Sequence, residues 1–380
     1  MALLAFAMTG FICIMTETIP AGLLPEISKD MQIPLSAAGQ WVTVYALGSL
    51  FTAIPLTVAT RAWPRRHVLL VTVVGFLTFN TVTALSSNIY LTFIARFGSG
   101  SAAGLAWALL AGYSRKIVPV HLQGRAMAIA MAGTPIALSV GVPLGTWLGH
   151  IMGWRQTFGA MSALSLLLIA WIGTSVPNVP GQSEHRKLPF RKVLQTTGVK
   201  PVLAVVLTWM LAHNILYTYI APFSGLSQMQ EHVDIILMAF GLAALVGLVF
   251  TGKVIDSNLR HVVLLSLAGF AAASLALGIF SSLPAVLITG CVLWGLTFGG
   301  AATLLNTALA DAAGDGADVA MSLTVVSWNL AIAMGGIVGG LLLENTGTAS
   351  LPWALLLLVF CSLSIVKLNN KHAFPVASRR

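Results

Sequence analysis

The chain consists of long apolar stretches separated by short polar breaks. About a dozen of these stretches reach the roughly 20 apolar residues that a helix needs to cross the hydrocarbon core of a bilayer. Within each stretch the residues are apolar throughout and do not alternate one by one, which favours transmembrane helices over barrel strands. The predicted spans are 2–26, 36–60, 67–87, 89–113, 126–149, 156–176, 201–222, 234–253, 261–281, 284–306, 319–342 and 351–367.

Composition points the same way. Hydrophobic residues make up 57% of the chain, charged residues only 8%, and the mean hydropathy is +0.90. A soluble globular protein carries about 25% charged residues. We therefore predict an all-α polytopic membrane protein with twelve transmembrane helices. Cys13, Cys291 and Cys361 lie singly in different spans, so we expect neither a disulfide framework nor a metal site.

The net charge of +9 is unevenly distributed over the breaks between spans. If the N-terminus lies inside the cell, the inner loops and tail carry seventeen Lys and Arg residues, whereas the outer loops carry only Lys29 and Arg155. This is the positive-inside bias of membrane proteins, and it predicts that both termini are cytoplasmic. The charge is thus a topology signal, and we expect no nucleic-acid partner.

The sequence contains an internal repeat. Arg66-His67-Val68 recurs 194 positions later as Arg260-His261-Val262. Three glycine pairs share this offset: Gly141 and Gly335, Gly145 and Gly339, Gly153 and Gly347. The copies run in the same direction, so we predict two parallel six-helix halves, as in many transporters. The expected divisions are a first half at 1–176, a central cytoplasmic loop at 177–200, a second half at 201–367 and a cytoplasmic tail at 368–380.

Glu17 is the only acidic residue deep inside a predicted span. A charge at membrane depth costs about 3 kcal/mol or more, so it marks a functional site by default. Arg96 is the only basic residue at such depth. At 1.5 Å per residue, Arg96 lies about 10 Å from Ile89 and Glu17 about 14 Å from Glu26, so the two charges lie at similar depth. They form either a proton-coupling site or a static pair that holds helices together.

The seventh span carries three polar residues. His213, Asn214 and Tyr217 have spacings of three and four, which place them on one helix face. We expect them to contact substrate, together with Trp294 and Trp107, whose rings offer flat surfaces for sugars or nucleobases. The alternative is that His213 is a packing residue and that the tryptophans serve the core or anchor the chain at the interface.

Several short motifs carry a family resemblance. They are Thr16-Glu17, Gly22-Leu23-Leu24-Pro25, Arg96 with Gly100, Gly141-Val142-Pro143-Leu144-Gly145, Gly153-Trp154-Arg155 with Phe158, Tyr217-Thr218-Tyr219-Ile220-Ala221-Pro222 and Trp294-Gly295. With the two parallel halves, these motifs resemble the twelve-helix drug:proton antiporter family of the major facilitator superfamily. The bacterial branch of sugar-efflux, arabinose-efflux-permease and purine-ribonucleoside-efflux proteins is the most similar.

The resemblance implies a cytoplasmic gate at two loops. The first loop keeps Arg61, Arg65 and Arg66 but lacks the leading glycine and the acid of the family pattern. The second keeps Asp256 and Arg260, which would latch the halves on the cytoplasmic side. Alternatively, these residues are only inside-positive anchors.

The fifth span carries an antiporter-like motif of Gly141, Pro143 and Gly145 in a looser form than the family pattern. Glycines four residues apart let a neighbouring helix approach closely, and close packing is the simplest role for them. A role in preventing leaks between the halves is implied only by the resemblance.

The resemblance implies a transporter and not an enzyme. The expected activity is proton-coupled antiport that exports sugars, nucleosides or drugs by alternating access, with Glu17 as proton carrier and the proton motive force in place of a cofactor. The protein would act as a monomer in the lipid bilayer of a bacterial inner membrane. The alternative is a symporter or facilitator that imports a small polar solute. At offset 194 the counterparts of Glu17 and Arg96 are Leu211 and Gly290, so proton chemistry would belong to the first half.

Overall fold

The computed structural model describes residues 1–181 and 190–375, and for residues 190, 256–258, 315 and 318 it describes the backbone alone. All regular elements in this described part are helical. Twelve helical segments are long and apolar enough to cross a membrane, and each overlaps one predicted span. The prediction of twelve transmembrane helices is confirmed.

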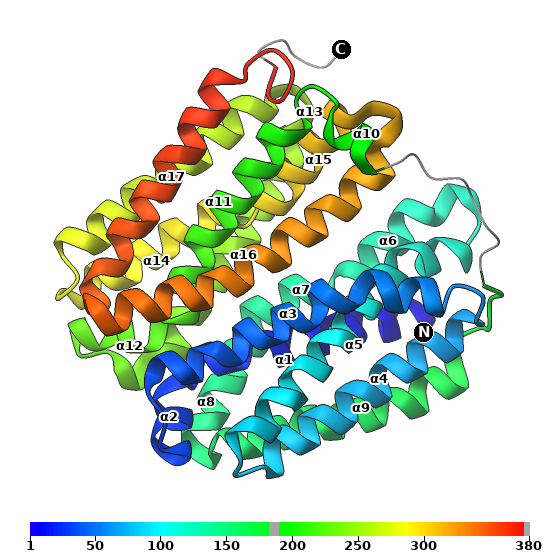
Figure 1. The fold of residues 1–380 in the computed structure, drawn as a ribbon, viewed down its shortest axis with the longest axis horizontal. Coiled ribbons are helices and arrows are strands. Elements are labelled where there is room, and N and C mark those ends of the chain that lie inside the picture. Colours follow the sequence, from blue (N-terminus) through cyan, green and yellow to red (C-terminus); the bar gives the residue numbers. More distant parts are fainter. Residues whose placement is uncertain (182–189, 376–380) are drawn as a thin grey trace. The chain divides into compact units, whose positions relative to one another are not determined.

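The chain divides into two compact units, Met1–His185 and Arg186–Arg380. The division falls in the segment 177–200 that was expected to be a loop, and among its described residues Phe190–Leu194 form a short helix, α10. Unit 1 contains α1 (Ala2–Gly22), α2 (Leu24–Met31), α3 (Leu35–Ala59), α4 (Arg65–Leu85), α5 (Ile89–Lys116), α6 (Gln123–Met131), α7 (Gly133–Ile136), α8 (Val142–Met152) and α9 (Trp154–Ser175). Its helix α1 packs against α3, α5, α8 and α9 (Figure 1).

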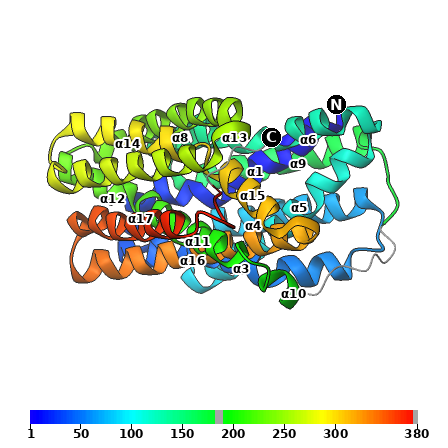
Figure 2. The ribbon, with the colours of Figure 1, turned by 90° about the horizontal axis from the view of Figure 1, so that it is seen from above.

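Unit 2 continues with α11 (Val199–Thr218), α12 (Ile220–Ser224), α13 (Val233–Ile279), α14 (Pro284–Phe298), α15 (Ala301–Ala313), α16 (Ala317–Asn345) and α17 (Leu351–Leu368). Its helix α11 packs between α16 and α17 (Figures 1 and 2). The helix α13 packs against α14 and also against α17. Each unit thus surrounds its first transmembrane helix with helices that come later in the sequence.

The structure corrects some predicted boundaries. The spans predicted at 234–253 and 261–281 are joined without a break in helical backbone and so share the label α13, although Gln230–Ile255 and Leu259–Ile279 are each long and apolar enough to cross a membrane separately. Conversely, the fifth span consists of α6, α7, a π-helical turn at Ala137–Gly141 and α8. The tenth span is interrupted between α14 and α15.

The repeat recurs in the contacts of two arginines. Arg66, at the start of α4, donates to the carbonyl of Gly173 near the end of α9. Arg260 donates to the carbonyl of Lys367 at the end of α17, with a nitrogen–oxygen distance of 3.5 Å. Donors and acceptors are both 194 positions apart. In each unit, therefore, an arginine binds the free carbonyls at the end of the unit's last helix.

The offset is not the same for every helix pair. Gly145 packs against Ile19 of α1, whereas Gly339, 194 positions later, packs against Tyr219 of α11. Ile19 and Tyr219 are 200 positions apart, so the counterpart of Glu17 is Tyr217. The expected counterpart Leu211 was wrong.

The fourth and tenth spans give a third offset. Gly100 packs against the carbonyl of Tyr45 and Gly295 against that of Phe240, and both pairs are related by 195 positions. The counterpart of Arg96 is therefore Cys291 and not Gly290. Since neither Cys291 nor Tyr217 is a charged residue like its counterpart, the second unit still lacks both charges.

Candidate functional site

Arg96 occupies the centre of unit 1. Its side chain is fully buried. Nε donates to the carbonyl of Trp41 on α3 at 3.2 Å, and Nη2 reaches the carbonyl of Glu17 on α1 at 3.5 Å. The guanidinium also lies 5.0 Å from the ring centre of Tyr45 and 5.6 Å from that of Phe158, within cation–π range. Arg96 thus joins α5 to α1, α3 and α9.

Glu17 lies next to Arg96, and the contact between them is made by the Glu17 main chain. The prediction placed the two charges at similar depth, and the structure brings the residues together through the Glu17 main chain. Among the described residues there is no ion pair between the Glu17 carboxylate and the guanidinium. The Glu17 side chain is half-buried. Arg96 therefore places a positive charge near Glu17, while both oxygens of the Glu17 carboxylate remain available to a proton or a ligand.

Other polar groups hold α1 around Glu17. Pro20 lies within α1 and lacks the N–H that would bond to the carbonyl of Thr16. The Thr16 hydroxyl accepts from the Asn80 amide at 2.9 Å, and the Tyr45 hydroxyl donates to the carbonyl of Cys13 at 2.9 Å. Sequence reasoning missed Asn80 and Tyr45, because both lie on other helices and nothing in their own spacing marks them.

The predicted antiporter-like motif packs against the helix that carries Glu17. A Cβ atom at Gly141 would meet Met15, and one at Gly145 would meet Ile19. Pro143 is buried in the first turn of α8, which directly follows the π-helical turn. These glycines therefore let the fifth span approach α1 closely, and a role in preventing leaks remains a prediction.

Unit 2 contains an aromatic cluster at the place equivalent to the Glu17 site. We define the aromatic cluster as His213, Tyr217, Phe240, Trp294 and Phe298. The His213 ring stacks on Phe298 with centres 3.7 Å apart and planes 5° apart. Its ring centre also lies 5.2 Å from the ring centres of Tyr217 and Trp294 and 5.7 Å from that of Phe240. All except Phe298 are buried.

Two polar atoms in the aromatic cluster have no partner. His213 Nδ1 and Trp294 Nε1 are buried without a hydrogen bond within the described part of the chain. A buried polar group without a partner costs about 1–3 kcal/mol, so such an atom needs an explanation. A bound molecule with its own donors and acceptors would supply one. Phe240 and Phe298 were not found from the sequence, because they come from other spans.

The remaining predicted substrate contacts lie elsewhere. Asn214 does not share the face of His213 and Tyr217: its Cβ packs against Gly335 on α16, and its amide donates to the carbonyl of Met210 at 2.7 Å. The expectation of one face was wrong, since His213 and Asn214 point about 100° apart. Trp107 belongs to unit 1, where it is partly buried against the core.

The predicted gate residues make contacts within their own units. Arg65 donates to the Arg61 carbonyl, and Arg66 and Arg260 bind the ends of α9 and α17 as described above. The Asp256 side chain lies outside the described residues, so its latch to Arg260 stays a prediction.

A second charged cluster lies where α2 and α4 end and α9 begins. The sequence marked it only through the Gly153-Trp154-Arg155 motif. Asp30 accepts hydrogen bonds from Trp154 at 3.1 Å and from Arg155 at 3.0 Å. Arg155 also donates to the carbonyls of Ala84 and Ser86 at the end of α4. It thus ties α2, α4 and α9 together.

Comparison with known proteins agrees with this architecture. The sequence profile of the Major Facilitator Superfamily matches residues 6–317 and 225–373. This chain belongs to that superfamily. It is 30% identical over 347 residues to the purine ribonucleoside efflux pump NepI of Escherichia coli O6:H1, covering 89% of this chain and 86% of that protein. It is also 30% identical over 350 residues to the proteins of that name from Salmonella typhimurium and Salmonella paratyphi B, covering 90% of this chain and 87% of each relative. The chain is a multi-pass transporter and not an enzyme.

Proposed function

We propose that this transporter is a proton-coupled antiporter that exports purine ribonucleosides across a bacterial inner membrane. The observation that carries the proposal is the half-buried carboxylate of Glu17, which lies in mid-span beside the buried Arg96 and is free of a direct ion pair to it. A carboxylate that lies near a cation but forms no ion pair with it can bind and release a proton.

In this mechanism Glu17 takes up a proton from the outer side and releases it inward as the nucleoside leaves. Each charge that enters gains about 2.3 kcal/mol per 100 mV of membrane potential. Each unit of pH difference adds about 1.4 kcal/mol. The proton motive force therefore suffices to drive export uphill, and no cofactor takes part.

The aromatic cluster supports the choice of substrate. A purine base is planar and carries ring nitrogens, and aromatic side chains that stack on a base contribute about 1–3 kcal/mol each. His213 Nδ1 and Trp294 Nε1 provide one nitrogen that can hydrogen-bond in either sense and one donor. The names of the relatives agree with this substrate class. We further propose that the chain acts as a monomer in the bilayer with both termini in the cytoplasm, as the charge bias predicts.

The proposal is tested in proteoliposomes loaded with a pH indicator. Purine ribonucleosides, sugars and amphipathic drugs are supplied one at a time. The proposed substrate class predicts that only purine ribonucleosides move protons. Antiport predicts that these protons move in the direction opposite to the solute. Protons that move with the solute would instead establish a symporter, and solute movement without protons a facilitator. A response to sugars or drugs alone would overturn the substrate class.

A further inference from the structure

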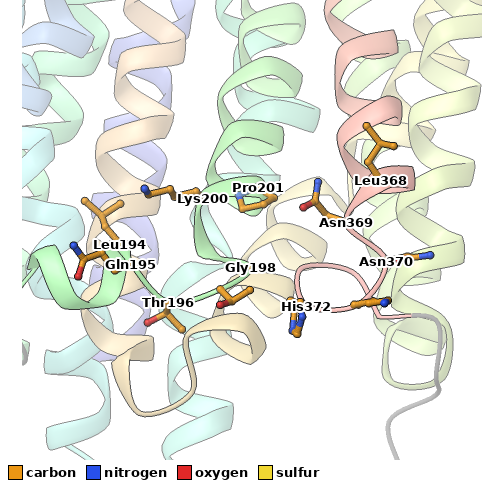
Figure 3. A pocket seen from close by; sticks show the side chains of 12 residues that line it. Leu194, Gln195, Thr196, Gly198, Lys200, Pro201, Leu368, Asn369, Asn370 and His372 are labelled. Atoms are coloured by element: carbon orange, nitrogen blue, oxygen red, sulfur yellow. The ribbon is translucent and has the colours of Figure 1, made fainter.

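A cavity of about 390 Å³ lies in unit 2, where α11 begins and α17 ends (Figure 3). Two segments line it: residues 194–198, 200 and 201 on one side, and residues 368–372 on the other. Both segments belong to the side that the charge bias predicts as cytoplasmic. Pro201 on its wall lies about 18 Å of helix before His213, so the cavity is separate from the aromatic cluster.

The walls of the cavity are fixed by packing. Gly198 has a φ of +99°, and a Cβ there would clash with the carbonyl of His372, so the two walls approach closely. Arg260 holds the chain beyond α17 by donating to the carbonyls of Val366 at 2.7 Å and Phe374 at 2.9 Å. The Phe374 side chain is completely buried. This part of the tail is thus anchored, and the cavity is a built feature.

Two lysines give the cavity positive charge. Lys200 and Lys371 line it together with His372, and the residues that line it include no carboxylate. None of the three forms an ion pair within the described residues. Gln195 adds side-chain amide donors, whereas the Thr196 hydroxyl donates to the carbonyl of Lys192. A cationic cavity with further donors attracts an anion with several acceptor oxygens, and phosphate is the common group of that kind.

The rim of the cavity is apolar. Leu194, Pro201 and Leu368 lie beside the lysines, and Leu368 is 81% exposed. From this rim α11 and α17 run together along the membrane span, joined by the hydroxyls of Thr208 and Ser362 at 2.7 Å. Leu357 and Phe360 continue the exposed apolar face of α17 beyond Leu368, so acyl chains attached to a phosphate in the cavity could lie along α17. Basic pockets between transmembrane helices on the cytoplasmic side bind anionic headgroups in this way.

We infer that this cavity binds the phosphate of an anionic glycerophospholipid. The inference concerns neither the transported solute nor the proton carrier, so it stands or falls independently of the proposed function. A soluble phosphate ester shares the headgroup chemistry, and the apolar rim favours the lipid.

The test uses the full chain, purified in an uncharged detergent and titrated with dioctanoyl phosphatidylglycerol. Dioctanoyl phosphatidylcholine and inorganic phosphate are titrated in parallel. Binding is measured as the rise of Tm with ligand concentration, since a ligand that binds only the folded state stabilises it. The test variant is Lys200→Gln with Lys371→Gln. Its matched control is Lys116→Gln with Lys253→Gln, which removes the same charge at exposed positions outside the cavity.

Phosphatidylglycerol is expected to stabilise the wild type saturably, whereas phosphatidylcholine is not. Near a membrane surface each lysine contributes about 1 kcal/mol to binding an anionic lipid, so the test variant should bind about 25-fold more weakly. The matched control and the charge-conserving variant Lys200→Arg with Lys371→Arg should bind like the wild type. Equal stabilisation by phosphatidylcholine, or unchanged affinity of the test variant, would overturn the site. Inorganic phosphate that binds as tightly as the lipid would overturn the lipid as the source of the phosphate.

Discussion

Replacing His213 by Phe separates substrate recognition from packing. His213 lies in a stack whose geometry a phenyl ring can reproduce: its ring centre is 3.7 Å from that of Phe298 and 5.2 Å from those of Tyr217 and Trp294. The substitution removes both ring nitrogens, and one of them, Nδ1, is buried and has no partner among the described residues. His213→Phe therefore keeps an aromatic ring in the stack and deletes the hydrogen-bonding capacity of the imidazole.

This substitution should change the stability of the fold and the rate of transport in opposite directions. Removing a buried polar atom without a partner should stabilise the fold by about 1–3 kcal/mol, because its desolvation is no longer a penalty. Each retained ring pair keeps its contribution of about 0.5–1.5 kcal/mol. If Nδ1 bonds to the substrate, the loss of that bond should weaken transport by about 1–2 kcal/mol, or five- to thirtyfold.

The assay compares Tm in detergent with the rate of purine ribonucleoside transport in proteoliposomes. His213→Phe should raise Tm and lower the rate of transport. Trp209→Phe is the control, because Trp209 Nε1 is likewise buried without a described partner and lies one turn earlier on α11. That variant should leave transport intact. Wild-type transport by His213→Phe would refute the assignment of His213 to substrate recognition.

Three further predictions concern the framework that holds these sites. Gly145→Leu should destabilise the protein by about 1–3 kcal/mol through overpacking against α1, whereas Gly159→Ala, whose added Cβ would meet no neighbouring helix within 4 Å, should keep or raise Tm, since alanine favours a helix interior over glycine. Equal Tm values for both variants would count against the close contact of α8 with α1. Arg155→Gln should cost about 1–3 kcal/mol by freeing the carbonyls of Ala84 and Ser86, and the neighbouring Lys29→Gln serves as its control in the same Tm measurement. Arg260→Gln should release the chain around Phe374 to limited proteolysis, and protection equal to that of Lys253→Gln would contradict this anchoring role.

The helices were predictable because the bilayer imposes a length and a continuous apolar run on each of them. The structure of the breaks was less predictable, since the short polar segment between the two spans of α13 has helical backbone where a loop was expected. The register between helices was not predictable. A single offset of 194 fits α8 with α16, whereas α1 with α11 requires 200, because the connections in the two units differ in length.

The candidate site was likewise predictable from the sequence only in part. Glu17 and Arg96 were identified from the rarity of charge at membrane depth, and that argument needs no knowledge of packing. Their partners Trp41, Tyr45 and Phe158 lie on other helices and follow no spacing rule. Asn214 shows the converse error, since a helical spacing suggested a shared face that its contact with α16 does not allow.

The central claim is that Glu17 couples the proton to the solute. The most direct test reconstitutes wild type, Glu17→Gln and the control Glu26→Gln, and measures purine ribonucleoside accumulation under an imposed pH gradient beside gradient-free exchange. For wild type and Glu26→Gln, one proton per solute predicts up to about tenfold accumulation per pH unit. Glu17→Gln is predicted to retain exchange and to lose accumulation. Accumulation by Glu17→Gln that follows the pH gradient as the wild type does would contradict the account.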